Sequence, residues 1–391
     1  MCKLRLFFKP SIMNKQDKKK GMLDRRKFLI GVGASASLAG TGLLTACTKN
    51  PPQTTCTRSN KTKPLSPYLI ERDTDDGGFS GGWLPHFSPS EELWVDTHVH
   101  LRGLTDSDSL KNLINKWFSI LDAYRLGKVV CITDQENFFD LFDATAQEDP
   151  RFAWMYWPKI DAPSLSKVQE AISHGSCAIK LHNSPVISGK TPRDIYQSDE
   201  WQSIFAYAAT NDVPLLWHAV SRVNASPYHG GHLHWLWKEG WENGVSFTNE
   251  NLLEDMLTLL RRFPTLKIIG AHALYIGLDR LAELFGEYKN LYIDSSCSMM
   301  LRWADDFSEE VRSQLCEFIE TWSERILFGS DASLFPGSID EFAIQAFLGH
   351  PRFMLKLWLS DKALQDVAWR NAYKLHKLKP GLWIRRGNVR P

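Results

Sequence analysis

The sequence predicts an α/β protein built as one closed (β/α)8 barrel. Strand-like and helix-like segments alternate between residues 93 and 331, which implies parallel pairing over a span of barrel size. Residues able to bind metals or transfer protons stand at the ends of five predicted strands, where such barrels carry their active sites. With 391 residues, 43% of them hydrophobic, the chain can bury a large core.

The first predicted strand covers residues 93–100 and contains two histidines. Side chains on a strand alternate between faces, so Asp96, His98 and His100 are expected on one face. The other face is expected to carry Leu93, Val95, Thr97 and Val99. Neutral imidazole is the commonest protein ligand for zinc and similar metals. The pair therefore indicates a metal site, the alternative being a polar strand end whose histidines only form hydrogen bonds.

The later elements follow from apolar periodicity, with a period of 3.6 for helices and short apolar runs for strands. Helices are expected at 108–124, 136–146, 164–174, 199–211, 251–263, 278–288 and 309–322. Strands are expected at 128–133, 152–157, 177–182, 213–218, 266–272, 291–294 and 326–331. A long insertion is expected at 219–249.

Four of these strands end with a polar residue. Lys180 belongs to the fourth strand, and His218, His272 and Asp331 end the fifth, sixth and eighth. Any one of them alone is more simply a satisfied polar group at a sheet edge. Together with the first strand they predict a single site, because the carboxyl ends of barrel strands meet at one face.

The N-terminal segment, residues 1–47, is typical of an export signal. The charged residues Asp24 to Lys27 precede an apolar run that reaches Ala46. Arg25 and Arg26 resemble a twin-arginine signal, which a receptor reads. The run ends in Leu-Thr-Ala-Cys at Cys47, similar to a bacterial lipobox with Cys47 as the lipidated residue. A simple signal anchor is the alternative.

These signals predict an exported lipoprotein on the periplasmic face of a bacterial membrane, attached only through its lipid. Residues 48–90, rich in Pro, Thr, Ser, Asp and Gly, are expected to form a flexible tether, followed by the barrel at 91–391. Met22 is a plausible start codon in place of Met1. Apart from Cys2 and Cys47, the remaining cysteines are odd in number and irregularly spaced, so no disulfide framework is expected, and Cys131 and Cys177 are interpreted as small buried residues.

Charge and composition restrict the partners. The formal net charge is +1 and no basic stripe follows the signal, which argues against nucleic acid. A small-molecule substrate is the expected partner. The sequence leaves open whether the protein forms a homo-oligomer.

The combined motif resembles the amidohydrolase superfamily. It consists of Asp96-Thr-His-Val-His100, Ile179-Lys-Leu-His182, the single His218 and His272, and Gly329-Ser-Asp331. It is most similar to the amidohydrolase-related branch (amidohydrolase 2), which includes aromatic-acid decarboxylases and lactone hydrolases. The segment 371–375 resembles the closing helix of that branch.

The resemblance implies a role for each matching residue. His98, His100, His218 and Asp331 would bind one divalent metal, expected to be Zn²⁺, and His272 would orient or polarise the substrate. Asp331 would also move the proton of a metal-bound water. Lys180 would be a free cation near the substrate, or a carboxylated bridge between two metals. Among loop residues, Arg222 and Arg302 are candidates for binding an anionic substrate, and His229, His232 and His234 stand beside them in the insertion.

Three functional hypotheses follow from these residues. The leading one is a metal-dependent hydrolase acting on a lactone or amide carbonyl. The second is a non-oxidative decarboxylase of an aromatic or unsaturated acid on the same site. The third, a ligand-binding lipoprotein without catalysis, is weakest because a binding protein does not need an open metal position beside a carboxylate.

Overall fold

The computed structural model describes residues 93–379 apart from 105, 122–124, 223–233, 297–308, 337, 340–353, 355–356 and 358. The strands are β1 (Trp94–Leu101), β2 (Leu126–Thr133), β3 (Phe152–Tyr156), β4 (Ile179–His182), β5 (Leu215–His218), β6 (Ile268–Gly270), β7 (Leu291–Asp294), β8 (Ile326–Leu327), β9 (Ala332–Phe335) and β10 (Ser338–Ile339). The predicted signal, Cys47, the tether and Arg302 lie outside the described residues.

Helices alternate with these strands as expected. They are α1 (Ser107–Leu121), α2 (Phe139–Glu148), α3 (Leu165–Ser173), α4 (Ser184–Ile187), α5 (Asp199–Thr210), α6 (Trp235–Glu242), α7 (Asn249–Arg262), α8 (Leu278–Glu287), α10 (Glu309–Trp322), α12 (Asp361–Gln365) and α13 (Asn371–Leu375). Short helical turns are η4 (Glu136–Phe138), η5 (Arg193–Gln197), η6 (Ala271–Tyr275), η8 (Ser323–Arg325) and the π-helical η9 (Asp366–Arg370). None of the helices in the described part is long and apolar enough to cross a membrane.

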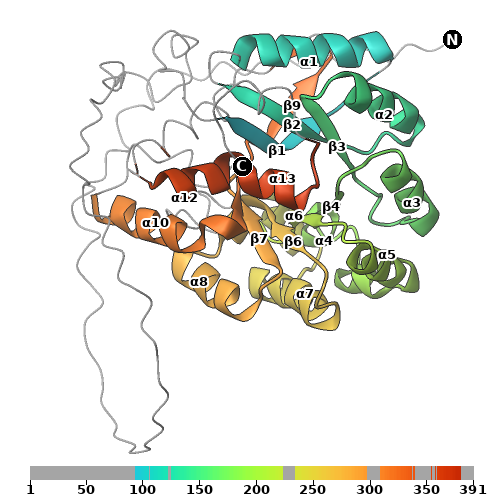
Figure 1. Cartoon of the computed structure of the whole chain (residues 1–391). Coiled ribbons are helices and arrows are strands. Elements are labelled where there is room, and N and C mark those ends of the chain that lie inside the picture. The colour runs from blue at the N-terminus through green and yellow to red at the C-terminus, as the bar shows by residue number, and fades with distance from the viewer. Residues whose placement is uncertain are drawn as a thin grey trace, which may run out of the picture. The chain divides into compact units, whose positions relative to one another are not determined.

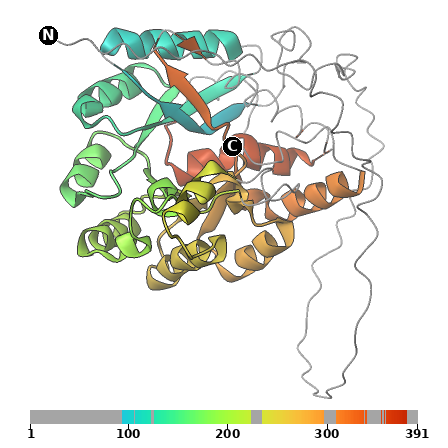
Figure 2. The same ribbon diagram turned by 180° about the vertical axis from the view of Figure 1, so that it is seen from behind.

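The strands form one sheet in the order β10-β9-β1-β2-β3-β4-β5-β6-β7-β8, parallel except for the pair β9–β10. The sheet closes because β8 continues through Phe328 to β9, which pairs with β1. Thr97 donates to Phe328 O from both its backbone N (3.0 Å) and its Oγ1 (2.6 Å). The helices α1, α2, α3, α5, α7, α8 and α10 surround the strands (Figures 1 and 2). The predicted α/β barrel is therefore confirmed.

The strand residues divide between two apolar cores, as the pleat requires. Alternate residues of β3, such as Trp154 and Met155, belong to the outer core beneath the helices and to a smaller inner core, respectively. Leu375 of α13 packs in the inner core. Lys128, near the start of β2, donates to Lys379 O (3.2 Å) just beyond α13. The closing helix therefore covers the amino-terminal end of the barrel, opposite the strand ends that carry the polar residues.

The strict alternation predicted for the first strand is wrong. Val95 belongs to the inner core, whereas Val99 packs in the outer core, although both were expected on one face. The register of β1 against β2 shifts between Asp96 and Val99, so an irregularity changes the faces within the strand. His98 and His100 still converge, because Nε2 of each lies near the same oxygen of Asp331.

The sixth strand was predicted at 266–272, and this prediction extends too far at the carboxyl end. Regular β6 stops at Gly270, and the next turn holds His272, Ala273, Leu274 and Tyr275 at φ values of 59°, 50°, 55° and 50°. L-residues avoid this left-handed region at a cost of about 1–2 kcal/mol each. Strain of this kind persists where the surrounding structure holds it, which is common at functional sites. His272 thus reaches the site from a left-handed turn.

Gly270 makes this turn possible, and its substitution is expected to be destabilising. A Cβ on Gly270 would lie 2.5 Å from Cγ of Leu274, which is fully buried and cannot move away freely. We expect Gly270→Ala to lower the free energy of unfolding by about 1–3 kcal/mol, the usual range for overpacking. Urea denaturation measures it.

Gly286, in α8, provides the matched control. A Cβ there meets nothing within 4 Å, so Gly286→Ala should raise stability by about 0.5–1 kcal/mol through helix propensity. The cost of Gly270→Ala should be smaller when it is measured in a Leu274→Ala background, where the contact with Cγ is gone. Equal effects of the two single substitutions would show that the turn does not press on Gly270.

The eighth predicted strand, 326–331, is interrupted. Regular pairing ends at Leu327 and resumes at Ala332, with Asp331 between them at φ 60°. Asp331 therefore does not end a strand, and its backbone N donates to His98 O (2.8 Å). The break turns its side chain toward β1. Sequence periodicity did not reveal the break because residues on both sides are apolar.

The predicted insertion 219–249 is not entirely without regular structure. It contains α6 and the first residue of α7, and Trp237 of α6 is buried while Trp241 is exposed. Among the described cysteines, Cys131 is free and buried and Cys177 is free and partly buried, which agrees with the prediction. Cys316 is disulfide-bonded, which the cysteine spacing did not indicate.

Candidate metal centre

Three donor atoms meet where β1 passes the interrupted eighth strand. His98 Nε2 lies 3.3 Å and His100 Nε2 3.2 Å from the same oxygen, Oδ1 of Asp331. His98 is fully buried and His100 is 7% exposed, whereas the Asp331 side chain is 25% exposed. Three of the four predicted ligands therefore face one point that is open to solvent on the Asp331 side.

The other two predicted histidines lie beside this group. His272 Nε2 is 3.2 Å from His218 Nδ1, and the His272 ring stacks on His98 with a centroid distance of 5.2 Å. His218 Nε2 is buried and has no hydrogen-bond partner among the described residues. Such atoms are rare in native proteins, and a ligand or ion is one explanation for this nitrogen.

Lys180 is fully buried at the centre of the cluster. Its Nζ lies 3.1 Å from His98 Nε2, the nitrogen that also faces Asp331. Burial lowers the pKa of Lys180 to about 8, against the opposing effect of the Asp294 and Asp331 charges. The structure thus brings Lys180 together with the predicted ligands.

The site favours neutral imidazoles and charged carboxylates. Burial, together with the Lys180 charge, lowers the pKa of His98 to about 4, and burial also lowers the pKa of His100 and, strongly, that of His218. Burial alone would raise the pKa of Asp331, but the His100 hydrogen bond and the nearby histidines hold it well below its usual range. These are the protonation states in which the groups bind a metal.

This donor set fits a divalent metal ion. Imidazole nitrogens and one carboxylate, with one position left open, are typical of catalytic zinc sites. Two groups of described residues could hold an ion, His98-His100-Asp331 and His98-His272-Asp294. The first is the better candidate, because the Asp294 oxygens of the second already accept hydrogen bonds from both histidines.

Sequence reasoning missed two buried polar residues of this cluster, Asp294 and Ser296, and assigned no role to a third, Asp96. Asp294 and Ser296 at the end of β7 contact both His98 and His272. Asp96 accepts from the backbone N of His98 (3.2 Å) and from Ser330 N (2.9 Å), which fastens β1 beside the interrupted strand. Burial raises the pKa of Asp96 to about 7. Asp294 carried a usable signal, since it ends a predicted strand as His218 does.

The rim of the site is aromatic and cationic. Trp157 stacks on His182 (5.6 Å, 20°), and Tyr275 stacks on His272 (5.2 Å, 19°). The Arg102 guanidinium lies 6.0 Å from the centre of the Trp157 ring. The spacing of Arg102 from His98 and His100 could have indicated its position, but no role was predicted for it.

The predicted loop residues are only partly described. Arg222 O accepts from His234 N (2.9 Å), and burial, Arg222 and His272 together lower the pKa of His234 to about 4. Arg222 therefore lies on the His272 side of the cluster. Arg302, His229 and His232 lie outside the described residues.

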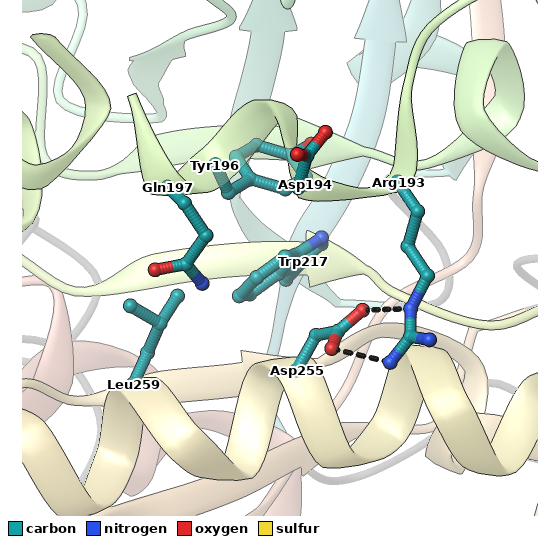
Figure 3. Close-up of a pocket in the computed structure, with 7 residues that line it drawn as sticks. All are labelled: Arg193, Asp194, Tyr196, Gln197, Trp217, Asp255 and Leu259. Atoms are coloured by element: carbon teal, nitrogen blue, oxygen red, sulfur yellow. Dashed lines mark hydrogen bonds and ion pairs between the residues drawn. The ribbon is translucent and has the colours of Figure 1, made fainter. Parts of the chain in front are cut away.

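A cavity of about 240 Å³ lies elsewhere, on the helix side of β5. Figure 3 shows Trp217 in its wall, between η5 and α7, with Arg193 paired to Asp255. Trp217 precedes His218, so the two side chains point to opposite faces of β5. The cavity is therefore separate from the histidine cluster.

The family model described as Amidohydrolase matches residues 127–378. No curated protein matches the chain. Solved structures with a similar course include an uncharacterised TIM-barrel protein from Bordetella bronchiseptica, which is 13% identical, with 73% of this chain and 99% of the other covered and a TM-score of 0.49. A putative amidohydrolase from Staphylococcus aureus is 16% identical, with 73% and 100% covered and a TM-score of 0.48. A 2,6-dihydroxybenzoate decarboxylase from Rhizobium is 15% identical, with 74% and 99% covered and a TM-score of 0.48.

The fold and the cluster define an α/β barrel enzyme whose buried histidines and aspartates could hold a metal at the carboxyl ends of its strands. The chain belongs to the amidohydrolase family. Enzymes of this family generally use a divalent metal.

Proposed function

We propose that the protein catalyses the metal-dependent, non-oxidative decarboxylation of a small, planar carboxylic acid. The observation that carries this proposal is the buried ammonium of Lys180 beside the donor cluster. This reverses the order of the two enzyme hypotheses drawn from the sequence.

Lys180 supports an anionic substrate. Its Nζ contacts His98 Nε2, the nitrogen that the proposed metal site requires. When His98 Nε2 serves as a metal ligand, its lone pair is no longer available to Lys180. A buried ammonium without an acceptor is costly, so it requires another partner. A substrate carboxylate would supply both the charge and the acceptor oxygens.

The aromatic rim supports a planar substrate. Trp157 stacks on His182 and Tyr275 stacks on His272, so two aromatic rings border the cluster. Flat rings stack favourably on such faces. Arg102 above Trp157 and Arg222 near His234 add positive charge at the rim for a second anionic group.

In the proposed site, His98, His100, His218 and Asp331 would hold one divalent metal, with zinc as the expected ion. The metal would polarise a carboxyl or carbonyl oxygen and lower the pKa of a bound water. Lys180 pairs with the substrate carboxylate. The bond between that carboxylate and its carbon breaks, CO₂ leaves, and the carbon takes up one proton, for which the Lys180 ammonium is a source inside the cluster.

Hydrolysis of a lactone or amide is the second candidate. It is favoured by Asp331, whose carboxylate is partly exposed and lies within 3.3 Å of two ligand nitrogens. A charged carboxylate in this position can take a proton from a water that attacks a carbonyl and return it to the leaving group. The exposed side of the cluster gives water access to it.

Isotope labelling separates the two reactions. The metal-loaded protein is incubated with hydroxybenzoic acids labelled with ¹³C in the carboxyl group, and separately with lactones in H₂¹⁸O. Decarboxylation releases ¹³CO₂ and, in D₂O, places one deuterium on the ring carbon. Hydrolysis instead introduces ¹⁸O into a product carboxylate. Release of ¹³CO₂ by a His98→Ala variant as well would refute decarboxylation at this site.

We further propose that the protein is exported and held at the periplasmic face of the membrane through lipid on Cys47. The proposal rests on the twin-arginine-like and lipobox-like segments. Two or more acyl chains anchor stably where one is marginal. Cys47→Ala is expected to abolish labelling of the mature protein with a radioactive fatty acid and to release it from membranes. Cys56→Ala is the control, and unchanged labelling of the Cys47 variant would contradict the assignment.

A further inference from the structure

Asp294 and Ser296, at the carboxyl end of β7, connect the two histidines on which the site depends. Both are fully buried. Asp294 Oδ2 lies 2.8 Å from His98 Nδ1, and Asp294 Oδ1 accepts from the backbone N of His272 (2.9 Å). Ser296 O lies 2.8 Å from His272 Nδ1. Its Oγ lies 2.9 Å from His98 Nδ1 and 3.0 Å from His272 Nδ1.

These contacts fix which nitrogen of each ring carries hydrogen. Asp294 Oδ1 receives three donors, from His272 N, Ser296 N and Ser296 Oγ, as expected of a charged carboxylate. A charged carboxylate only accepts hydrogen bonds, so Nδ1 of His98 must be the donor. A backbone carbonyl also only accepts, so Nδ1 of His272 must be the donor to Ser296 O. A ring that carries one hydrogen, on Nδ1, keeps the lone pair of Nε2.

The contact with His272 also determines which nitrogen of His218 carries hydrogen. With one hydrogen on the His272 ring, held on Nδ1 by Ser296 O, the 3.2 Å contact between His272 Nε2 and His218 Nδ1 requires His218 to donate from Nδ1. The lone pair of His218 is then on Nε2. That atom is the buried nitrogen without a hydrogen-bond partner among the described residues.

We propose that Asp294 and Ser296 are positioning residues that set the tautomers of His98, His272 and His218. They thereby direct the bare Nε2 atoms of His98 and His218 toward the metal. The inference rests on the proposed metal site and adds to it a reason why these imidazoles are ready to bind before any ion arrives. Ligand histidines commonly donate their other nitrogen to a carboxylate or carbonyl, and losing that partner weakens metal binding by about 10–100-fold.

Asp294→Asn is a sharp test because the orientation of its amide is forced. Oδ1 of Asp294 receives three donors, from His272 N, Ser296 N and Ser296 Oγ. The amide oxygen must remain there, so the NH₂ group takes the place of Oδ2 and faces His98 Nδ1. In the variant, His98 Nδ1 faces an NH₂ donor and keeps only Ser296 Oγ as an acceptor. This favours the tautomer with the ring hydrogen on Nε2, which lacks the lone pair that would bind the metal.

The experiment measures metal affinity and tautomers on the full chain. Zn²⁺ affinity is determined by competition with a chromophoric chelator, and ¹⁵N-histidine NMR of the metal-free protein reports which ring nitrogen is protonated. We expect Asp294→Asn to weaken Zn²⁺ binding about 10–100-fold and to move the His98 hydrogen from Nδ1 to Nε2. A His98→Gln spectrum assigns the signal.

Asp366→Asn is the matched control. Asp366 is also a buried carboxylate, but it accepts from Ser323 Oγ and Lys362 Nζ rather than from a histidine of the cluster. It should leave Zn²⁺ affinity and all histidine signals unchanged. Thermal unfolding of both variants separates loss of stability from loss of affinity.

Two results would overturn the inference. One is an Asp294→Asn variant with wild-type Zn²⁺ affinity. The other is a wild-type spectrum in which His98 or His218 carries its hydrogen on Nε2, and this measurement decides the matter even if Asp294→Asn does not fold. A wild type with the expected tautomers that binds no Zn²⁺ would instead refute the proposed metal site and leave the tautomer assignment standing.

Discussion

His98→Ala is expected to remove the bound metal and all metal-dependent turnover. His98 contributes the most constrained nitrogen of the cluster, since Nδ1 is held by Asp294 while Nε2 lies 3.3 Å from Asp331. Without it, the cluster loses one of its imidazole donors. Elemental analysis of purified protein should give about one ion per chain for the wild type and none for the variant.

His174→Ala is the control for this prediction, because His174 lies on the surface with Asp140 at 2.9 Å. It should keep its metal. Full metal occupancy in the His98 variant would remove His98 from the ligand set. Two ions in the wild type, lost on Lys180→Ala and restored by short carboxylic acids, would show that Lys180 is a carboxylated bridge.

Asp331→Asn is expected to lower kcat by about 10²–10⁴-fold, the usual range for losing a group that transfers protons. The amide cannot accept a proton, and it removes the negative charge beside His98 and His100. The backbone should tolerate the change, because Asn occupies the left-handed region about as readily as Asp, and residue 331 has φ 60°. Circular dichroism and thermal unfolding check that the fold is kept.

Asp140→Asn, a surface carboxylate in α2, is the comparison variant and should leave kcat unchanged. Steady-state kinetics and metal content are measured on both proteins, first as purified and then at saturating metal. Should Asp331→Asn retain near-native kcat, Asp331 would be excluded from proton transfer in either candidate reaction. A loss that excess metal fully restores would assign it to metal binding alone.

The barrel could be predicted from the sequence because its strands and helices differ in apolar period, and elements such as β7 and α5 match closely. Local backbone departures were not predictable. The turn after Gly270 consists of ordinary L-residues in a left-handed conformation, and no residue type there signals it. The break before Asp331 is likewise accompanied by contacts with β1, and the contact between Asp96 and Ser330 joins residues 234 positions apart in the chain.

The sequence predicted those residues of the candidate site that stand at or near the ends of strands. His98, His100, His218, His272 and Lys180 were grouped because barrel strands end at one face. The sequence pattern could not predict the direction in which each side chain points. Asp294 and Ser296 bind nitrogens that point away from the shared donor point, so their role appears only once ring orientations are known.

At the seam between β1 and the interrupted strand, metal binding and the stability of the barrel are expected to be coupled. Asp331 N donates to His98 O, so two of the proposed ligands are also the residues that close the barrel. An ion bound by their side chains would favour the closed ring over any opened form, and thermodynamic linkage would then raise the melting temperature with free metal concentration. Chelation should correspondingly speed hydrogen exchange first at the amide of Asp331, while the β3 and β4 amides on the far wall stay protected.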